Sequence, residues 1–297
     1  MNIIVEINNL TKTYGRIVAL DDVSLQVPQG VVYGILGPNG SGKTTLLGLL
    51  LTILRPDKGS IRIFGEPPTA KGRQKIGTLL ETPNFYHYLS AWQNLRIAAK
   101  IKQVNHPDYE GVLRQTGLWE RRQSPFSSYS LGMKQRLAIA SCLLGDPEVM
   151  IFDEPTNGLD PKGIAEIRQL IVNLAHEGRT IIMASHLLDE VEKVCSHVAI
   201  LKQGKLMATG HVDEILHQDQ LVELGSENSA QLREAMAQYP GVKIIDLTAK
   251  DIFTVSITNE NADLGKINQY CFENGVILNR LVRKKQSLES KFIEITN

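Results

Sequence analysis

Nine residues at positions 37–45 read GPNGSGKTT and match the pattern G-x-x-x-x-G-K-[ST] of a phosphate-binding loop. An apolar run over residues 30–36 precedes the loop and predicts a buried strand, and the apolar run over 45–54 has helical length. Strand, loop and helix in this order form the context in which such a loop binds phosphate. The alternative, a glycine-rich turn with an incidental lysine, does not account for both flanks. The pattern predicts an α/β fold around a phosphate site.

The residue types of this loop suit a triphosphate and a magnesium ion. Glycine permits positive φ and lets backbone N–H groups approach an anion closely. The helix that follows directs the positive end of its dipole at the same point. We expect Lys43 to reach the β and γ phosphates and the Thr44 hydroxyl to bind Mg²⁺. The predicted nucleotide-binding residues of the loop are Gly37, Pro38, Asn39, Gly40, Ser41, Gly42, Lys43, Thr44 and Thr45.

Length and charge narrow the class of protein. A chain of 297 residues is long enough for one large domain or two. The 32 Lys and Arg residues equal the 32 Asp and Glu residues, so there is no basic excess to indicate nucleic acid as a partner. Three widely spaced cysteines argue against a disulfide framework or a zinc site and favour a reducing cytoplasm.

No segment of the sequence predicts membrane insertion. The first ten residues lack a basic region followed by a long apolar segment, so we expect no signal peptide. The apolar stretch at 46–54 is far shorter than the roughly 20 residues that a membrane-spanning helix needs. If this protein acts at a membrane, we expect another chain to span it.

Polar residues follow three more predicted strands. These apolar runs lie at residues 75–80, 148–152 and 180–184. They end at Glu81, at Asp153 with Glu154, and near His186, and ligands collect at the carboxyl ends of strands in such sheets. Asp153 could hold Mg²⁺ through water, and Glu154 could orient or deprotonate an attacking water. The alternatives are a solvated acidic turn for the pair and a structural histidine for His186.

The first strands and the middle of the chain surround these motifs. Alternation predicts strands over residues 3–10 and 19–27, with an exit turn at 12–15 whose Tyr14 could stack on a nucleotide base or simply pack in the turn. Residues 86–145 predict a helical subdomain inserted into the sheet. Within it, Ser90 and Gln93 form a capping box and Ser130 is a natural N-cap.

The pattern changes after about residue 217. Strands and helices follow in the order β-α-β-β-α-β, which is the ferredoxin-like layout, and residues 288–295 predict a last amphipathic helix. No chemistry is visible in this segment, so a regulatory or contact-forming role is expected.

Taken together, the motifs resemble the ATP-binding subunit of an ABC transporter, with matches over residues 1 to about 217. Residues 37–45 look like its Walker A motif, 149–154 like Walker B with the catalytic glutamate, and 157–160 like the D-loop that ends at Asp160. Tyr14 is similar to the adenine-stacking aromatic of the A-loop, and His186 to the switch histidine.

Two motifs depart from the family pattern. The signature, usually LSGGQ, is YSLGM at 129–133 and keeps only Ser130 and Gly132. The Q-loop glutamine aligns with Glu81, whose charge near the γ-phosphate would slow hydrolysis or alter coupling. Both variants resemble the branch that includes bacitracin and lantibiotic exporters, as does the tail of about 80 residues.

The resemblance implies a P-loop cassette with a mixed sheet core and inserted helices over 1–217, and a small α+β accessory domain over 218–297. It implies ATP and Mg²⁺ as cofactors, with Glu154, His186 and Lys43 catalytic. Thr44, Glu81 and Asp153 would hold the metal. A homodimer or paired cassette would hold each ATP between Lys43 of one copy and Ser130 with Gly132 of the other.

The function that the resemblance implies is ATP hydrolysis that powers export of a peptide antibiotic or similar amphiphile through a separate membrane permease. The chain would then lie in the cytoplasm, on the inner face of the membrane, with no nucleic acid as partner. One alternative is a soluble ABC-type ATPase acting on ribosomes or nucleic acid, although the chain has one cassette and no heptad run. Another, suggested by Glu81, is a protein that holds ATP without turnover.

Overall fold

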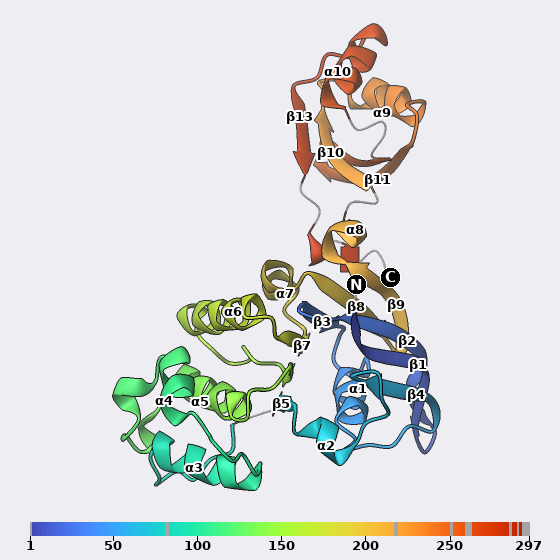
Figure 1. The fold of residues 1–297 in the computed structure, drawn as a ribbon. Helices are drawn as coiled ribbons and strands as arrows, with labels where there is room; N and C mark the ends of the chain where they lie inside the picture. The colour runs from blue at the N-terminus through green and yellow to red at the C-terminus, as the bar shows by residue number, and fades with distance from the viewer. Residues whose placement is uncertain are drawn as a thin grey trace. The chain divides into compact units, whose positions relative to one another are not determined.

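The computed structural model of the chain describes residues 2–80, 83–216, 219–249, 252–258, 263–284, 287–289 and 291–292. The chain divides into two compact units, residues 1–211 and residues 212–295. Figure 1 labels most of the helices and strands of the two units.

The first unit is built on a sheet of six strands. Their spatial order is β5 (Ile76–Leu79), β6 (Val149–Asp153), β7 (Thr180–Ser185), β3 (Val32–Leu36), β8 (His197–Lys202) and β9 (Lys205–His211). The first five are parallel, and β9 is antiparallel to β8. Leu36 pairs with Ser185, and Asp153 pairs with Ala184. The carboxyl ends of β3, β6 and β7 therefore meet at one edge, as the sequence predicted.

An antiparallel sheet of three strands completes the β structure of this unit. It comprises β2 (Ile17–Pro28), β1 (Ile3–Tyr14) and β4 (Lys58–Ile63), in that order. The predicted exit turn at 12–15 is wrong, because Lys12, Thr13 and Tyr14 still pair with β2. The turn lies at Gly15 and Arg16 instead. The apolar alternation ends here because these strand residues are exposed, and not because the strand pairing ends.

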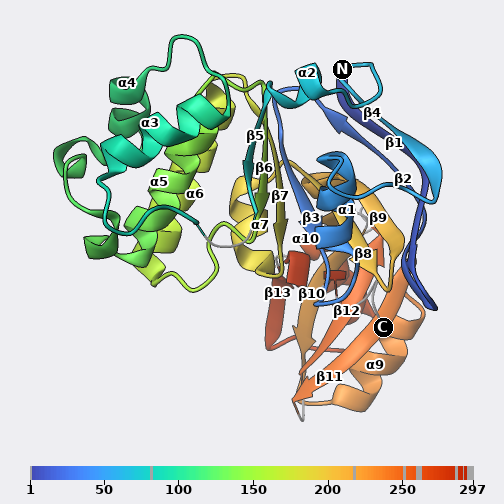
Figure 2. The same cartoon turned by 90° about the horizontal axis from the view of Figure 1, so that it is seen from below.

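Helix α1 (Lys43–Leu50) lies between the two sheets (Figure 2), and its leucines join the core that the sheets share. The predicted helix over 45–54 is wrong at its end. Thr52 has φ +56, and the N–H groups of Ile53 and Leu54 both donate to the Gly48 carbonyl at 2.9 and 3.0 Å. Residues beyond the helix are apolar because they cover the core: Leu51 is buried and Leu54 packs against the cluster.

Two helices of the first unit pack near the central strand. They are α6 (Pro161–His176) and α7 (Leu188–Val194). A Cβ at Gly34 of β3 would lie 2.7 Å from Cγ1 of Val191 in α7. Glycine is therefore required here for close packing of helix on strand. A short helix, α2 (Ala70–Arg73), precedes β5.

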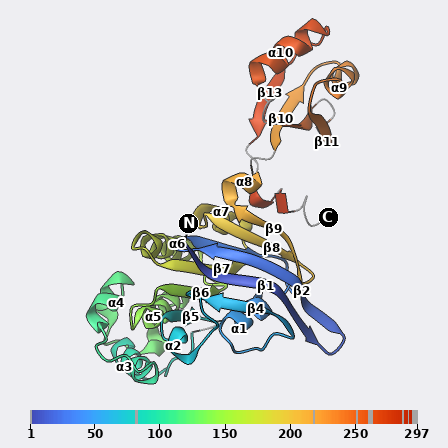
Figure 3. The same ribbon diagram turned by 45° about the vertical axis from the view of Figure 1, so that its right-hand side comes forward.

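The middle of the chain is helical, as predicted, and gathers beyond β5 on one side of the unit (Figure 3). It contains α3 (Ala91–Ile101), α4 (Tyr109–Gln115) and α5 (Leu131–Leu143), with 3₁₀ turns at Trp119–Arg121 and Phe126–Ser128. The predicted capping box is confirmed, since Gln93 N–H donates to Ser90 Oγ at 3.2 Å and Ser90 N–H donates to Gln93 Oε1 at 2.9 Å. Among the described residues, no helix combines the length and apolar character that crossing a membrane needs.

The second unit begins with α8 (Val212–Leu216) and contains a sheet of four strands. The elements that follow are β10 (Asp219–Gly225), α9 (Ser229–Ala237), β11 (Val242–Ala249), β12 (Ile252–Thr258), α10 (Leu264–Glu273) and β13 (Arg280–Lys284). The sheet is antiparallel with spatial order β11-β12-β10-β13, and α9 and α10 cover its apolar face. Of the predicted last helix, residues 288–289 and 291–292 are helical, and the rest of 288–295 lies outside the described residues.

Candidate functional site

The phosphate loop bends tightly against its neighbours. Gly40 has φ +79 and Gly42, the N-cap of α1, has φ +105. A Cβ at Gly42 would lie 2.5 Å from the carbonyl oxygen of Ala19. A Cβ at Gly37 would lie 2.5 Å from the carbonyl oxygen of Leu201. Both positions therefore need glycine because the space for a side chain is already filled.

Lys43 extends back over the loop that it follows. Its Nζ donates to the Gly37 carbonyl at 2.8 Å and to the Pro38 carbonyl at 3.3 Å. The residue is 6% exposed, and Nζ lies 4.0 Å from Oε1 of Glu154. The ammonium group is thus held at the mouth of the loop, where it can meet phosphate oxygens.

Oxygen atoms suited to a metal ion lie beside the lysine. The Thr44 hydroxyl donates to Oδ2 of Asp153 at 3.1 Å, and Asp153 is 5% exposed at the end of β6. Hydroxyl and carboxylate oxygens are the donors that Mg²⁺ prefers. The two residues therefore fit a magnesium ion shared with a bound triphosphate.

Glu154 follows Asp153 in an unusual backbone conformation. Its φ of +48 lies in the left-handed region, and its N–H donates to the Ala184 carbonyl at 3.0 Å. Oε2 of Glu154 lies 2.8 Å from Nδ1 of His186. A non-glycine residue in this region carries strain that the surrounding contacts must hold. The strand end and the histidine thus fix the carboxylate near Lys43.

A tight turn links Glu154 to α6. The Asn157 N–H donates to the Glu154 carbonyl at 3.1 Å, and Asp160 caps α6 by accepting from the Gly163 N–H at 3.0 Å. Asp160 is therefore engaged in a helix cap, which supports the position of the turn.

These elements enclose a pocket of about 460 Å³, a size typical of small-ligand sites. The predicted residues that line it are Asn39, Gly40, Ser41, Gly42, Lys43, Thr44, Thr45, Asp153 and Glu154. The lining also includes residues that were not predicted as site residues: Ile17, Val18, Ala19, Pro83 and Gln135, with Leu131 from segment 129–133 and Asn157 from segment 157–160. The structure thus brings the phosphate loop and the carboxylates of Asp153 and Glu154 together in one pocket.

Other predicted site residues lie outside the described lining of this pocket. They are Tyr14, Gly37, Pro38, Ser130, Gly132, Asp160 and His186. Tyr14 is 45% exposed and is the cross-strand partner of Ile17, which does line the pocket. His186 reaches the pocket through Glu154. Glu81, the predicted Q-loop residue, lies outside the described residues.

The segment before Ser130 is anchored by an aromatic residue. Tyr129 is 4% exposed, and its hydroxyl donates to the Arg121 carbonyl at 2.7 Å. Burial raises the pKa of Tyr129, so the phenol remains a hydrogen-bond donor. Ser130 is exposed and caps α5 by accepting from the Met133 N–H at 3.3 Å. Ser130, the predicted signature serine, thus lies on the surface at a helix N-terminus.

Two kinds of signal could have found the missed lining residues. Ile17 and Val18 are β-branched residues that are 69% and 48% exposed. They follow directly after the turn beside Tyr14, the candidate stacking residue, which makes them candidates for the same site. Leu131 and Gln135 are four residues apart and share one face of α5. Nothing in the sequence indicated that this face meets the phosphate loop.

A phosphate loop between the central strand of a mixed sheet and a buried helix, with two acidic residues on a neighbouring strand end, defines a P-loop nucleotide-binding cassette. The family model described as "ABC transporter" matches residues 20–157. The cassette belongs to this class by both fold and sequence.

Known relatives extend the match to nearly the whole chain. The bacitracin transport ATP-binding protein BcrA of Enterococcus faecalis is 34% identical over 99% of this chain and 97% of its own length. BcrA of Bacillus licheniformis is 37% identical, with 99% and 98% covered. The lantibiotic transport ATP-binding protein SrtF of Streptococcus pyogenes is 37% identical over 76% of this chain and 94% of its own.

Solved structures agree with the sequence relatives. An ATP-binding subunit of an ABC transporter is 30% identical with a TM-score of 0.65, covering 72% of this chain and 92% of that one. The cbiO1 protein from Clostridium perfringens, described as part of the transporter complex cbiONQ, is 30% identical with a TM-score of 0.66, covering 81% and 97%. The chain belongs to the ATP-binding subunits of ABC transporters.

Proposed function

We propose that this chain hydrolyses ATP and that its cycle drives a separate membrane permease. The observation that carries the proposal is the meeting of Lys43, Thr44 with Asp153, and Glu154 with His186 around one pocket. Thr44 and Asp153 would hold Mg²⁺, with Glu81 as a third oxygen donor. When bound, Mg²⁺ supplies neutralisation of charge on the phosphate oxygens.

Three residues of this chain would have distinct roles in hydrolysis. Glu154 would accept a proton from the attacking water, because its carboxylate is held at the pocket wall. His186, at 2.8 Å from that carboxylate, would keep it in position and bear on the γ-phosphate. Lys43 would stabilise the charge that develops on the phosphoryl oxygens. Release of phosphate from Mg-ATP by the purified chain tests this function, and binding without turnover would favour an ATP-holding protein instead.

We propose that two copies share each ATP. Support comes from the exposure of Ser130 and from the absence of Ser130 and Gly132 from the described lining of their own chain's pocket. A Lys43→Met chain and a Ser130→Arg chain should each be inactive alone. A mixture should recover activity, because the mixed dimer contains one site with both residues intact. Failure of the mixture to exceed either variant, with dimers present, would contradict a shared site.

A groove beside β5 suits a segment of the membrane permease. It has a volume of about 620 Å³, and its lining includes Ile53 and Ile101, which are 65% and 76% exposed. Large exposed apolar side chains gathered on one groove favour contact with another chain. The charged residues that line it within the described chain are Arg73 and Lys102. The occupant that this chemistry favours is an amphipathic cytoplasmic loop with an acidic residue.

Co-purification with the membrane subunit encoded by a neighbouring reading frame tests this contact. Ile101→Asp should reduce recovery of the pair. Met207→Asp is the matched control, because Met207 is an exposed apolar residue on β9, the opposite edge strand of the main sheet from β5. Equal recovery of both variants would argue against the groove.

The cargo proposed is a peptide antibiotic or similar amphiphile, moved out of the cell, with the chain on the inner face of the membrane. The names of BcrA and SrtF support it, since those proteins are described as transporting bacitracin and a lantibiotic. Expression with the permease should raise the concentration of such a peptide that stops growth, and the Glu154→Gln chain should not. A soluble ATPase acting on ribosomes or nucleic acid is not favoured by these relatives.

We propose that the tail is a separate accessory domain of ferredoxin-like layout, beginning near residue 218. The strand order β11-β12-β10-β13, with α9 and α10 as crossovers, supports this layout. Limited proteolysis should cut first between the two units and release a fragment of about 80 residues. Initial cleavage inside either unit would argue against the division.

A further inference from the structure

The end of strand β1 extends past one of its two neighbours. The pairing of β1 with β4 stops at Thr11 and Lys58, because β4 begins at Lys58. Three more residues of β1, ending in Tyr14, continue beyond that point. Backbone groups on the side where β4 has ended need other partners.

Asp57 supplies those partners from the residue just before β4. Its N–H donates to the Thr11 carbonyl at 2.9 Å, which continues the pattern of the ladder. Its carboxylate Oδ2 accepts from the N–H of Thr13 at 2.6 Å and from the hydroxyl of Thr13 at 2.7 Å. One side chain therefore takes the place of the next strand residue and holds the end of β1.

The same carboxylate also holds a cation beside the candidate stacking residue. Nζ of Lys12 donates to Oδ1 of Asp57 at 2.9 Å and lies 5.6 Å from the ring centroid of Tyr14. The hydrogen bond from the Thr13 hydroxyl, followed by that from Lys12, lowers the pKa of Asp57 to about 2. The carboxylate is therefore ionised at any pH at which the protein works.

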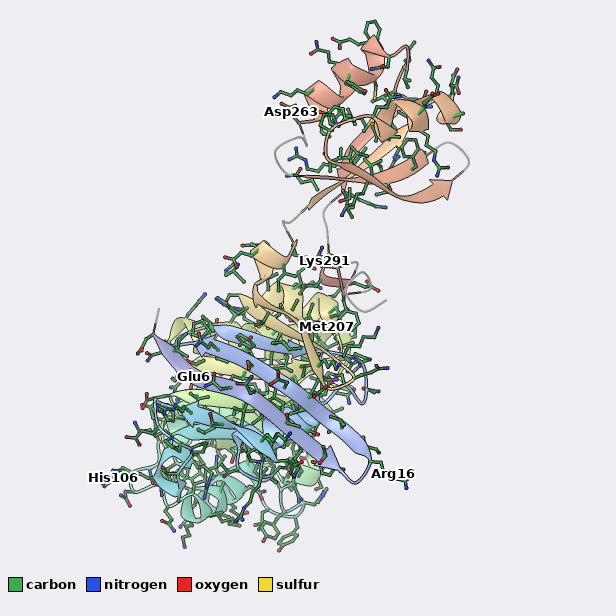
Figure 4. All side chains as sticks on the ribbon, turned by 90° about the vertical axis from the view of Figure 1, so that its right-hand side faces the viewer. Glu6, Arg16, His106, Met207, Asp263 and Lys291 are labelled. Carbon is green, nitrogen blue, oxygen red and sulfur yellow. The ribbon has the colours of Figure 1, made fainter. Side chains whose placement is uncertain are left out.

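The opposite side of this strand end leads to the pocket. Thr13 pairs with Val18 and Tyr14 pairs with Ile17 across the hairpin, and both β2 residues line the pocket. The ladder between β1 and β2 is irregular on each side of Lys12, so it does not by itself fix this segment firmly. Figure 4 labels Arg16 at the tip of the hairpin, just past Tyr14.

We propose that Asp57 is a positioning residue of the nucleotide site, which holds the hairpin so that Tyr14 and Ile17 meet the base of the bound nucleotide. The inference rests on the proposed function, because it concerns the base of the same ATP. Asp57 does not touch the pocket in the described structure and acts through Thr13 and Lys12. Its effect is therefore specific to the base and absent for the phosphates.

Binding of two ligands by the full chain tests this division. Isothermal titration with Mg-ATP and with magnesium tripolyphosphate, which lacks a base, compares wild type with Asp57→Ala. We expect Mg-ATP to bind about three- to ten-fold more weakly to the variant, from loss of exposed hydrogen bonds, and tripolyphosphate to bind unchanged. Asp57→Asn should lie between, because its amide oxygen can still accept from Thr13. An equal loss for both ligands would overturn the proposal by indicating general damage.

A double-mutant cycle tests whether the effect runs through the aromatic ring. In a Tyr14→Ala chain, the effect of Asp57→Ala on Mg-ATP binding should be reduced to the part that Ile17 carries; an undiminished effect would overturn the proposal. Glu148→Gln is the control, since it breaks a similar exposed ion pair, Lys75 to Glu148 at 2.8 Å, at the amino end of β6. If wild type and Asp57→Ala bind Mg-ATP with the same affinity, this inference alone is overturned. If wild type binds no Mg-ATP, the proposed function is overturned as well.

Discussion

Replacing Glu154 by glutamine should separate nucleotide binding from the proposed catalysis at this site. The substitution keeps the size of the side chain and an oxygen that can face His186, but it removes the carboxylate that is proposed to take a proton from water. Loss of a general base lowers kcat by about 10²- to 10⁴-fold, which corresponds to about 2.7–5.4 kcal/mol in the activation free energy. We therefore expect phosphate release by Glu154→Gln to fall at least about 100-fold.

For the same Glu154→Gln variant, electrostatics predicts that the affinity for Mg-ATP does not fall. Oε1 of Glu154 is 4.0 Å from Nζ of Lys43, so a phosphate bound to that lysine would lie near the carboxylate and be repelled by it. A phosphate charge about 4 Å from the carboxylate would be repelled by about 4 kcal/mol at an effective dielectric constant near 20. The Glu154 side chain is 22% exposed, which screens part of this repulsion. Mg-ATP should thus bind the variant as tightly as wild type or more tightly, and the shared-site dimer should persist.

The assay is steady-state phosphate release beside equilibrium binding of Mg-ATP. Glu148→Gln is the matched control, because Glu148 precedes β6 and Glu154 follows the same strand at its other end. The control should retain wild-type turnover. Turnover of Glu154→Gln within a few-fold of wild type would refute the role assigned to this carboxylate.

Three further predictions concern the loop, a buried thiol and the Q-loop position. Gly42→Ala should lower the free energy of unfolding by about 1–3 kcal/mol, because φ is +105 and the new Cβ would lie 2.5 Å from the Ala19 carbonyl oxygen. Gly178→Ala, at φ +91 with open space around its Cβ, should cost less in the same thermal melts, and equal costs would contradict the steric argument. Burial raises the pKa of Cys142 to about 11, so iodoacetamide at pH 8 should label it at least about ten-fold more slowly in the native chain than in urea; equal rates would mean an open thiolate. Glu81→Gln should speed phosphate release by removing a negative charge near the γ-phosphate, and a slower variant would contradict that reasoning.

Local motifs made much of the site predictable. Residues 37–45 carry their own chemistry, and the structure gives Gly42 the positive φ that the pattern requires. Asp153 and Glu154 could be assigned to a strand end because four apolar residues precede them, and parallel strands bring such ends to one edge. The capping box at Ser90 was predictable for the same reason, since both partners lie within one turn.

Contacts between distant segments explain what the sequence did not reveal. Leu51 and Leu54 are apolar because they cover a core, and not because helix α1 continues. The end of α1 is marked only by the left-handed backbone conformation of Thr52. Gln135 and Ile17 reach the pocket from elements far from the loop in sequence, which no periodicity encodes. The hydrogen bonds of Asp57 to the end of β1 depend on the folded sheet, so the local sequence did not reveal them.

Titration of the purified chain with Mg-ATP, in wild type and in Lys43→Met, tests the central claim most directly. Lys43 is buried over the loop, and its ammonium group donates to the Gly37 and Pro38 carbonyls, so its loss removes the charge that is proposed to meet the phosphates. The account predicts saturable binding to wild type and at least about ten-fold weaker binding to the variant, with its thermal unfolding still cooperative. A wild-type chain without saturable binding, or a variant that binds equally well, would contradict it.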